Sequence, residues 1–274
     1  MTTLAPTVAP ALTGDVAASK LGDVLRSERT KFRTLASSWW TLLTVLVGTI
    51  AVGLITCWAV VAHWDQMSLA EKATLDPTFK SLIGLFIGQV AVGILGVLAI
   101  TSEYATGMIR TTFAAVPRRR VVLTAKAAVT GATTLVVGEL GAFASFFLAQ
   151  AILSRRNLGV SLAEPTVARA VLVEGMLLFV CAMIGVGLGA MIRPTAGAVA
   201  VLVGLFYLPA LLNVLPPPWN NRIGRFTLID AAQQASALNP NHDLFSPAIS
   251  VLILLAWPAA VVLAAALLIT RRDE

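Results

Sequence analysis

Three polar side chains interrupt long apolar runs of this sequence and are the first candidates for chemistry: Gln89, Glu139 and Glu174. A charged group at the centre of a membrane-spanning helix costs roughly 2.5 to 3.5 kcal/mol, so its presence calls for an explanation. Such groups can bind a cationic substrate or line a wet cavity, and all three are candidate substrate-path residues. We favour that role for Glu139. For Glu174 we favour a simpler explanation, because it is close enough to the surface to reach water or Arg169.

A second group of chemically versatile residues lies between two apolar runs, in the stretch SEYATGMIRTTFAAVPRRR (102–120). Gly107 allows a bend near its start, and Pro117 suits a stop near its end. An apolar stripe on one side of a charged helix can lie on lipid or fill a groove in a partner protein. Helical spacing predicts such a stripe, about three turns long, from Tyr104, Met108, Thr112 and Val116, with Ile109 and Phe113 beside them.

The composition places these residues in an integral membrane protein. Of the 274 residues, 57% are hydrophobic and only 12% are charged, with a mean hydropathy of +0.84. A soluble domain of this length has no core large enough to hide so much apolar surface. The net charge of +6 resides at the ends of apolar runs, where membrane topology and anionic headgroups account for it better than nucleic acid. Cys57 and Cys181 lie inside apolar runs and are expected to be buried thiols.

The apolar runs predict an all-α polytopic fold with six transmembrane helices in one domain, 21–274, behind a disordered tail, 1–20. An even number of spans puts both termini on one side. With the termini inside, 13 Lys and Arg residues are internal and seven are external, which predicts that both termini are cytoplasmic. The protein is expected in the plasma membrane. The six spans are expected at about 40–62, 82–102, 121–153, 168–191, 195–215 and 245–270.

The segment before the first span is predicted to be an amphipathic helix, 21–38, in the cytoplasmic headgroup layer. Leu21, Val24, Leu25, Phe32 and Leu35 fall on one helical face. A simple polybasic anchor and a docking surface remain equally good interpretations of this helix. Its basic residues are Arg26, Arg29, Lys31 and Arg33.

Motifs for soluble-type catalysis are absent from the sequence. ATP hydrolysis needs a loop of the form GxxxxGK[ST], and the chain has no Gly-Lys dipeptide. It also lacks HExxH, GxSxG and a GxGxxG turn after a strand. We therefore expect no enzyme activity, no catalytic residues, no metal site and no cofactor bound by this chain.

The segment after the second span resembles that of ABC-2 type transporter permeases, in which an acidic-aromatic pair is followed by Gly, a hydrophobic pair and Arg. The basic amphipathic helix, the Trp-rich first span and the RRDE after the last span are similar as well. The resemblance implies a cytoplasmic coupling helix between spans 2 and 3 that docks on a separate ABC ATPase subunit. The docking residues it implies are Glu103, Tyr104, Gly107, Met108, Ile109, Arg110 and Phe113, with Glu103 and Arg110 making charged contacts at the rim.

The same resemblance implies that ATP and Mg bind the partner ATPase and that a second permease copy, identical or a close paralogue, completes a dimeric pore in membrane lipid. The cargo would be an amphiphilic small molecule, peptide or lipid, as in drug or antibiotic efflux. In such permeases the outer region after span 5 often folds back into the membrane as a gate; here Trp219 and Phe226, with a short helix at 228–238, suit that position.

Two other functions compete with this one. An ion-coupled secondary transporter would use Glu139 to carry the proton, although the two halves of the chain show no convincing internal repeat. A non-transporting membrane scaffold or enzyme would leave the 102–120 segment lying on lipid. Glycines in the spans, including the pair Gly84 and Gly88, are expected to serve helix packing.

Overall fold

The computed structural model describes residues 21–271 except 35, 117, 208, 210, 212, 213, 215, 217, 218, 242 and 243, and the side chain of 221. The expected all-α fold is confirmed for these residues; the predicted disordered tail, 1–20, lies outside them. The helices in chain order are α1 (Leu21–Thr34), α2 (Ala36–Ala62), η1 (Trp64–Gln66), α3 (Leu69–Ala73), α4 (Pro77–Ala105), α5 (Met108–Ala115), α6 (Arg119–Leu153), η2 (Ser154–Arg156), α7 (Pro165–Ile192), α8 (Thr195–Tyr207), α9 (Trp219–Gly224), α10 (Leu228–Ser236) and α11 (Pro247–Arg271).

Five of the described helices, α2, α4, α6, α7 and α11, are long and apolar enough to cross a membrane. The chain is therefore a polytopic membrane protein. The structure describes the predicted fifth span, 195–215, only in part. Its helix, α8, has 13 residues and is about 20 Å long, less than the roughly 30 Å of a hydrocarbon core. The rest of that predicted span falls on residues that are only partly described.

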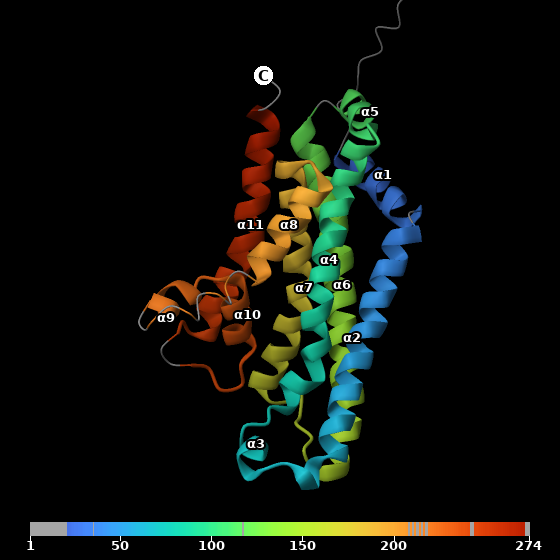
Figure 1. Ribbon diagram of the computed structural model, residues 1–274. Helices are drawn as coiled ribbons and strands as arrows, with labels where there is room; N and C mark the ends of the chain where they lie inside the picture. The colour runs from blue at the N-terminus through green and yellow to red at the C-terminus, as the bar shows by residue number, and fades with distance from the viewer. Residues whose placement is uncertain are drawn as a thin grey trace, which may run out of the picture.

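The long helices form one bundle with two distinct ends. Figure 1 shows α1, α5 and the last turn of α11 together at one end, called here the α5 end, and α3 at the other, the α3 end. α9 and α10 lie on the side of the bundle between the two ends. Because α7 and α11 both finish at the α5 end, the segment from α8 to α10 carries the chain back along the bundle.

The central helix of the bundle is α7, which packs against α4, α6, α8, α10 and α11. It is apolar on all sides, as expected for a helix surrounded by others. The largest core cluster brings together Leu85 and Val92 of α4, Phe146 of α6, Leu178 and Ala182 of α7 and Ala265 of α11.

Glycines allow the central helices to approach closely. A Cβ at Gly96 of α4 would overlap the backbone of Ala182 on α7, and one at Gly185 would overlap the Gly93 carbonyl. Between α2 and α4, a Cβ at Gly84 would meet the Thr49 backbone, which confirms the packing role expected for this glycine. The helices that carry the polar residues of the spans are thus fixed by backbone contact.

Candidate functional site

The predicted docking segment is a short helix set apart from α4 by one glycine. α4 ends at Ala105, and Gly107 has φ +73°, a left-handed conformation that costs glycine little. The Gly107 amide donates to the Tyr104 carbonyl at 3.2 Å, and α5 then begins at Met108. The stripe predicted from Tyr104 to Val116 is therefore divided between two helices, with Tyr104 on α4.

Helix α5 presents only part of its apolar surface to the bundle. Ile109 is buried, whereas Met108 is 47% exposed and Arg110 is exposed as well. Phe113 is half-buried, and the Arg119 guanidinium lies 5.1 Å from the centre of its ring. α5, which lies at one end of the bundle (Figure 1), is thus anchored through Ile109 and Phe113, while Met108 and Arg110 are exposed.

Immediately before α5, four charged side chains meet in what we call the charged cluster: Glu28 and Lys31 of α1, Glu103 of α4 and Lys126 of α6. The Lys126 ammonium donates to Glu28 and to Glu103, both at 2.7 Å. The Lys31 ammonium donates to Glu28 at 2.7 Å and to Glu103 at 3.1 Å. The cluster joins three segments that are far apart in sequence.

Most of the charged cluster is inside the protein. Glu103 is 4% exposed, Lys126 5% and Glu28 6%, whereas Lys31 is half-buried. Two acids and two lysines compensate one another, as buried charges require. Burial alone lowers the pKa of Lys31, but hydrogen bonds to Glu28 and Glu103 and their negative charges outweigh it, so the net pKa is raised. Lys31 is therefore positively charged at neutral pH.

The structure places Glu103 differently from the rim position implied by the resemblance. Its carboxylate is directed into the bundle and bonded to both lysines, so it is a positioning residue for the α4–α5 junction. One of its oxygens, Oε2, is buried without a hydrogen-bond partner among the described residues. Arg110, in contrast, remains at the surface, where a rim contact is possible.

The next residue, Tyr104, makes a contact on the opposite side of α4 from the charged cluster. The Arg193 guanidinium lies 5.4 Å from the centre of the Tyr104 ring. Arg193 itself has φ +69° in the sharp turn between α7 and α8. One turn earlier, the Thr195 hydroxyl donates to that of Thr101 at 2.9 Å. The last turn of α4 is therefore tied to α1 and α6 on one side and to the α7–α8 turn on the other.

The predicted interfacial residues separate into two groups. Arg26, Arg29 and Arg33 are exposed on α1, as a headgroup-facing surface requires, whereas Lys31 turns inward to the charged cluster. Sequence analysis missed Glu28 and Lys126 as site residues. A signal exists for each, since Glu28 is an acid between Arg26 and Arg29, and Lys126 is a charge inside an apolar run.

A cavity of about 520 Å³ lies beside the charged cluster, between α1, α2, α4 and α6. All four charged residues contribute to its wall, as does Met108 at the start of α5.

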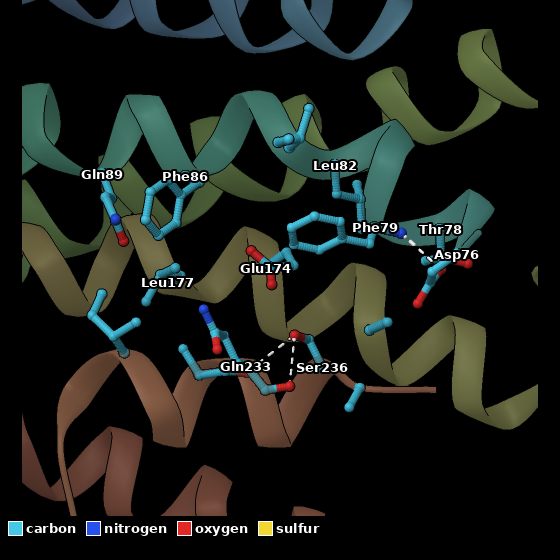
Figure 2. A pocket seen from close by; sticks show the side chains of 15 residues that line it. Asp76, Thr78, Phe79, Leu82, Phe86, Gln89, Glu174, Leu177, Gln233 and Ser236 are labelled. Atoms are coloured by element: carbon cyan, nitrogen blue, oxygen red, sulfur yellow. Dashed lines mark hydrogen bonds between the residues drawn. The ribbon is translucent and has the colours of Figure 1, made fainter. Parts of the chain in front are cut away.

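The three candidate substrate-path residues lie in two separate places. Gln89 and Glu174 line a second cavity, between α4, α7 and α10 (Figure 2). Glu139 is not among its lining residues; its carboxylate packs against Gly175 on another face of α7, with Oε2 buried and unpartnered among the described residues. Arg169, the expected contact of Glu174, donates to the Ala237 carbonyl at 2.6 Å.

The predicted outer helix, 228–238, is observed as α10, Leu228–Ser236. It packs on α7 and α11. The Trp257 indole of α11 donates to the Phe226 carbonyl at 3.0 Å, and Gln234 of α10 donates to the Asn241 and Phe245 carbonyls. The region is therefore folded against the side of the bundle (Figure 1).

In comparisons with known proteins, no family model matches this sequence and no curated protein matches it significantly.

Proposed function

We propose that this chain is the membrane-spanning permease subunit of an ATP-driven ABC transporter that exports an amphiphilic small molecule, peptide or lipid. A separate cytoplasmic ABC ATPase would bind ATP and Mg and hydrolyse the nucleotide. This chain would supply the route through the membrane and the surface on which the ATPase acts, with no cofactor or catalytic residue of its own.

The observation that carries the proposal is the exposed part of α5 at one end of the bundle. Met108 and Arg110, both in the first turn of α5, are exposed and supply one apolar and one charged side chain for contact with a partner. A helix of eight residues with such a surface fits a groove of a partner protein better than it fits lipid alone, because its large apolar residues Ile109 and Phe113 already pack on the bundle.

The charged cluster supplies a mechanical link between that surface and the spans. Separating buried opposite charges costs several kcal/mol, so the segments that carry them move together. A partner that displaces α5 would pull on Glu103, and through Lys126 and Glu28 it would move α6 and α1. ATP binding to the partner would then shift the equilibrium between two arrangements of the spans.

The proposed topology has six crossings, both termini in the cytoplasm and the α5 end facing the cytoplasm of the plasma membrane. α8 with the residues after it would make the fifth crossing. In support, exposed basic residues gather at the α5 end, as the positive-inside rule requires of a cytoplasmic face. These residues are Arg26, Arg29, Arg33, Arg110, Arg118 and Arg120.

A second permease copy, identical or a close paralogue, would complete the pore. The outer face of α2 carries large apolar side chains suited to contact with lipid or another copy. They include Trp40, Leu43, Val47, Ile55 and Trp58.

The test is nucleotide hydrolysis by the complex. The tagged chain, extracted from its native membranes in mild detergent, is expected to co-purify with Mg-dependent ATPase activity. Arg110→Glu should lower the co-purified activity at least tenfold, whereas Arg155→Glu, an exposed arginine at the α3 end, should leave it unchanged. Equal activity with both variants would reject α5 as the docking surface.

The alternative function, an ion-coupled secondary transporter, is favoured by one observation. Glu139 has a buried carboxylate oxygen without a partner among the described residues, as expected of a proton carrier. Transport that survives ATP depletion, stops with an uncoupler and is abolished by Glu139→Gln would support this alternative. Transport that depends on ATP and persists in Glu139→Gln would exclude it.

A further inference from the structure

The second cavity, of about 490 Å³, has a chemistry distinct from the rest of the molecule. It lies in the half of the bundle nearer the α3 end, between the start of α4, the first half of α7 and the side helix α10 (Figure 2). Its volume is that of a typical small-molecule site.

The charged residues of the cavity wall are all acidic. Asp76 and Glu174 contribute carboxylates, and neither a lysine nor an arginine is among the described residues that line it. Figure 2 shows the Glu174 carboxylate directed into the space between α4 and α10, toward Gln233. The side chains of the wall therefore favour a cation over an anion; Arg169 donates to the carbonyl of the lining residue Ala237 but does not itself line the cavity.

Most of the remaining wall is apolar and aromatic. Phe79 and Phe86 of α4 stand on one side of Glu174, and Leu177 lies one turn further along α7 (Figure 2). Aromatic faces attract organic cations, especially where water is scarce. Phe79 and Phe86 are 48% and 41% exposed, so their rings are available for contact with a ligand.

Two buried oxygens in the cavity wall lack a hydrogen-bond partner. Gln89 and Thr78 are each 1% exposed, and neither Gln89 Oε1 nor Thr78 Oγ1 has a partner among the described residues. Figure 2 shows the Gln89 amide pointing from α4 toward α7, at the far end of the cavity from Asp76. An acceptor buried in this way leaves a free-energy penalty that a donor on a ligand would remove.

Helix α10, which forms one wall of the cavity, is held in place by hydrogen bonds at both of its ends. Thr227 caps α10 by accepting from the Asp230 amide at 3.2 Å, and Gln234 ties the far end of α10 to the Asn241 and Phe245 carbonyls. This positions Gln233 and Ser236, which complete the polar side of the cavity. The cavity is preformed, as ligand sites usually are.

We infer that this cavity binds an organic ammonium ion that carries an N–H group and an apolar, preferably aromatic, body. Glu174 pairs with the positive charge, Gln89 Oε1 accepts from the N–H, and Phe79, Phe86 and Leu177 hold the apolar body. A bare metal ion does not fit, since no group of three or more metal-ligating side chains occurs among the described residues. Binding of the ammonium ion is independent of the proposed function. The further statement that the bound ion is also transported rests on the proposed function.

The test uses 1-naphthylmethylammonium and its neutral counterpart 1-naphthylmethanol. The chain alone, in phosphatidylcholine nanodiscs without an ATPase, is titrated with each compound by calorimetry, and empty nanodiscs are subtracted. We expect saturable binding of the ammonium at least tenfold tighter than that of the alcohol, a difference of about 1.4 kcal/mol.

Matched variants assign the site. Glu174→Gln is expected to weaken ammonium binding at least tenfold and to leave the alcohol unchanged, and Gln89→Leu to weaken the ammonium severalfold. Glu71→Gln, an exposed acid on α3 outside the cavity, is the control and should bind as the unaltered chain does. Circular dichroism melts confirm that each variant is folded.

Three results would each overturn the inference. The first is equal binding of ammonium and alcohol, which would indicate a cavity for lipid chains. The others are unaltered ammonium binding by both Glu174→Gln and Gln89→Leu, and the absence of saturable binding. Confirmed binding without ATP-dependent export of the ammonium by the native complex would instead count against the proposed function and leave the site intact.

Discussion

The ammonium group of Lys126 lies 2.7 Å from the carboxylate of Glu103, and both side chains are about 5% exposed. Lys126 belongs to a long helix of the bundle, whereas Glu103 precedes by four residues the glycine that starts α5. A buried ion pair therefore connects the last turn of α4, which leads into α5, to α6. Glu28 accepts from the same ammonium, so α1 is held at the same point.

Removing the central cation should destabilise the protein strongly. Lys126→Met keeps the length of the side chain but leaves Glu28 and Glu103 buried without their shared partner. We expect a loss of about 3–5 kcal/mol in the free energy of unfolding, measured from thermal unfolding in detergent. Arg118→Met, an exposed position, is expected to change it by less than about 0.5 kcal/mol. Similar stability of the two variants would mean that the cluster is not stabilising.

Exchanging charges tests the pairing itself. Glu103→Lys and Lys126→Glu should each destabilise the protein, because each places like charges together. The double variant restores an opposite pair at these two positions, but each new charge then lies beside a like charge on Glu28 or Lys31, so the recovery is expected to be partial. A coupling energy of about 0.5–3 kcal/mol is expected from the four unfolding measurements. The exposed pair Asp65 and Arg156, 2.8 Å apart, is the reference and should give no more than about 1 kcal/mol. Additive single effects in the cluster would argue against direct pairing.

The attachment of α1 depends on Glu28. Glu28→Gln removes the negative charge that compensates the positive charges of Lys31 and Lys126, so α1 should separate from the bundle more often. Hydrogen exchange followed by mass spectrometry is expected to show faster exchange in 21–34. Asp23→Asn changes an exposed acid of the same helix and should leave exchange unaltered. Unchanged exchange in Glu28→Gln would place the anchoring of α1 elsewhere, in Val24 and its apolar neighbours.

Close contact between α4 and α7 should make Gly96 intolerant of any side chain. Gly96→Ala forces a methyl group into the Ala182 backbone and is expected to cost about 1–3 kcal/mol of stability. Gly48→Ala, on α2, meets no atom within 4 Å and should be neutral or stabilising by up to about 1 kcal/mol. Unfolding measurements on the two variants provide the comparison; equal stability would show that the helices separate without cost.

The membrane character and the long helices follow from the sequence, because about 20 consecutive apolar residues satisfy the bilayer wherever they occur. α2, α4, α6, α7 and α11 correspond to predicted spans. The break at Gly107 was anticipated as a bend, and the structure shows that this glycine is left-handed, with φ +73°.

The charged cluster could not be derived from sequence in the same way. Glu28 and Lys126 are 98 residues apart, and nothing local shows that α1 packs on α6. Each residue taken singly looked like a topology signal or a surface charge. The grouping of Gln89 with Glu174, and the separate place of Glu139, likewise depend on which faces of α4, α6 and α7 meet.

The most direct test of the account is a cross-link from α5 in living cells. A photoreactive amino acid at Met108, which is 47% exposed, is compared with one at Leu69 of α3, which is 87% exposed at the opposite end. We predict that Met108 alone forms a covalent adduct with a protein that carries a GxxxxGK[ST] loop, and that Arg110→Glu abolishes it. An adduct with lipid only, or an ATPase captured from Leu69 and not from Met108, would contradict the account.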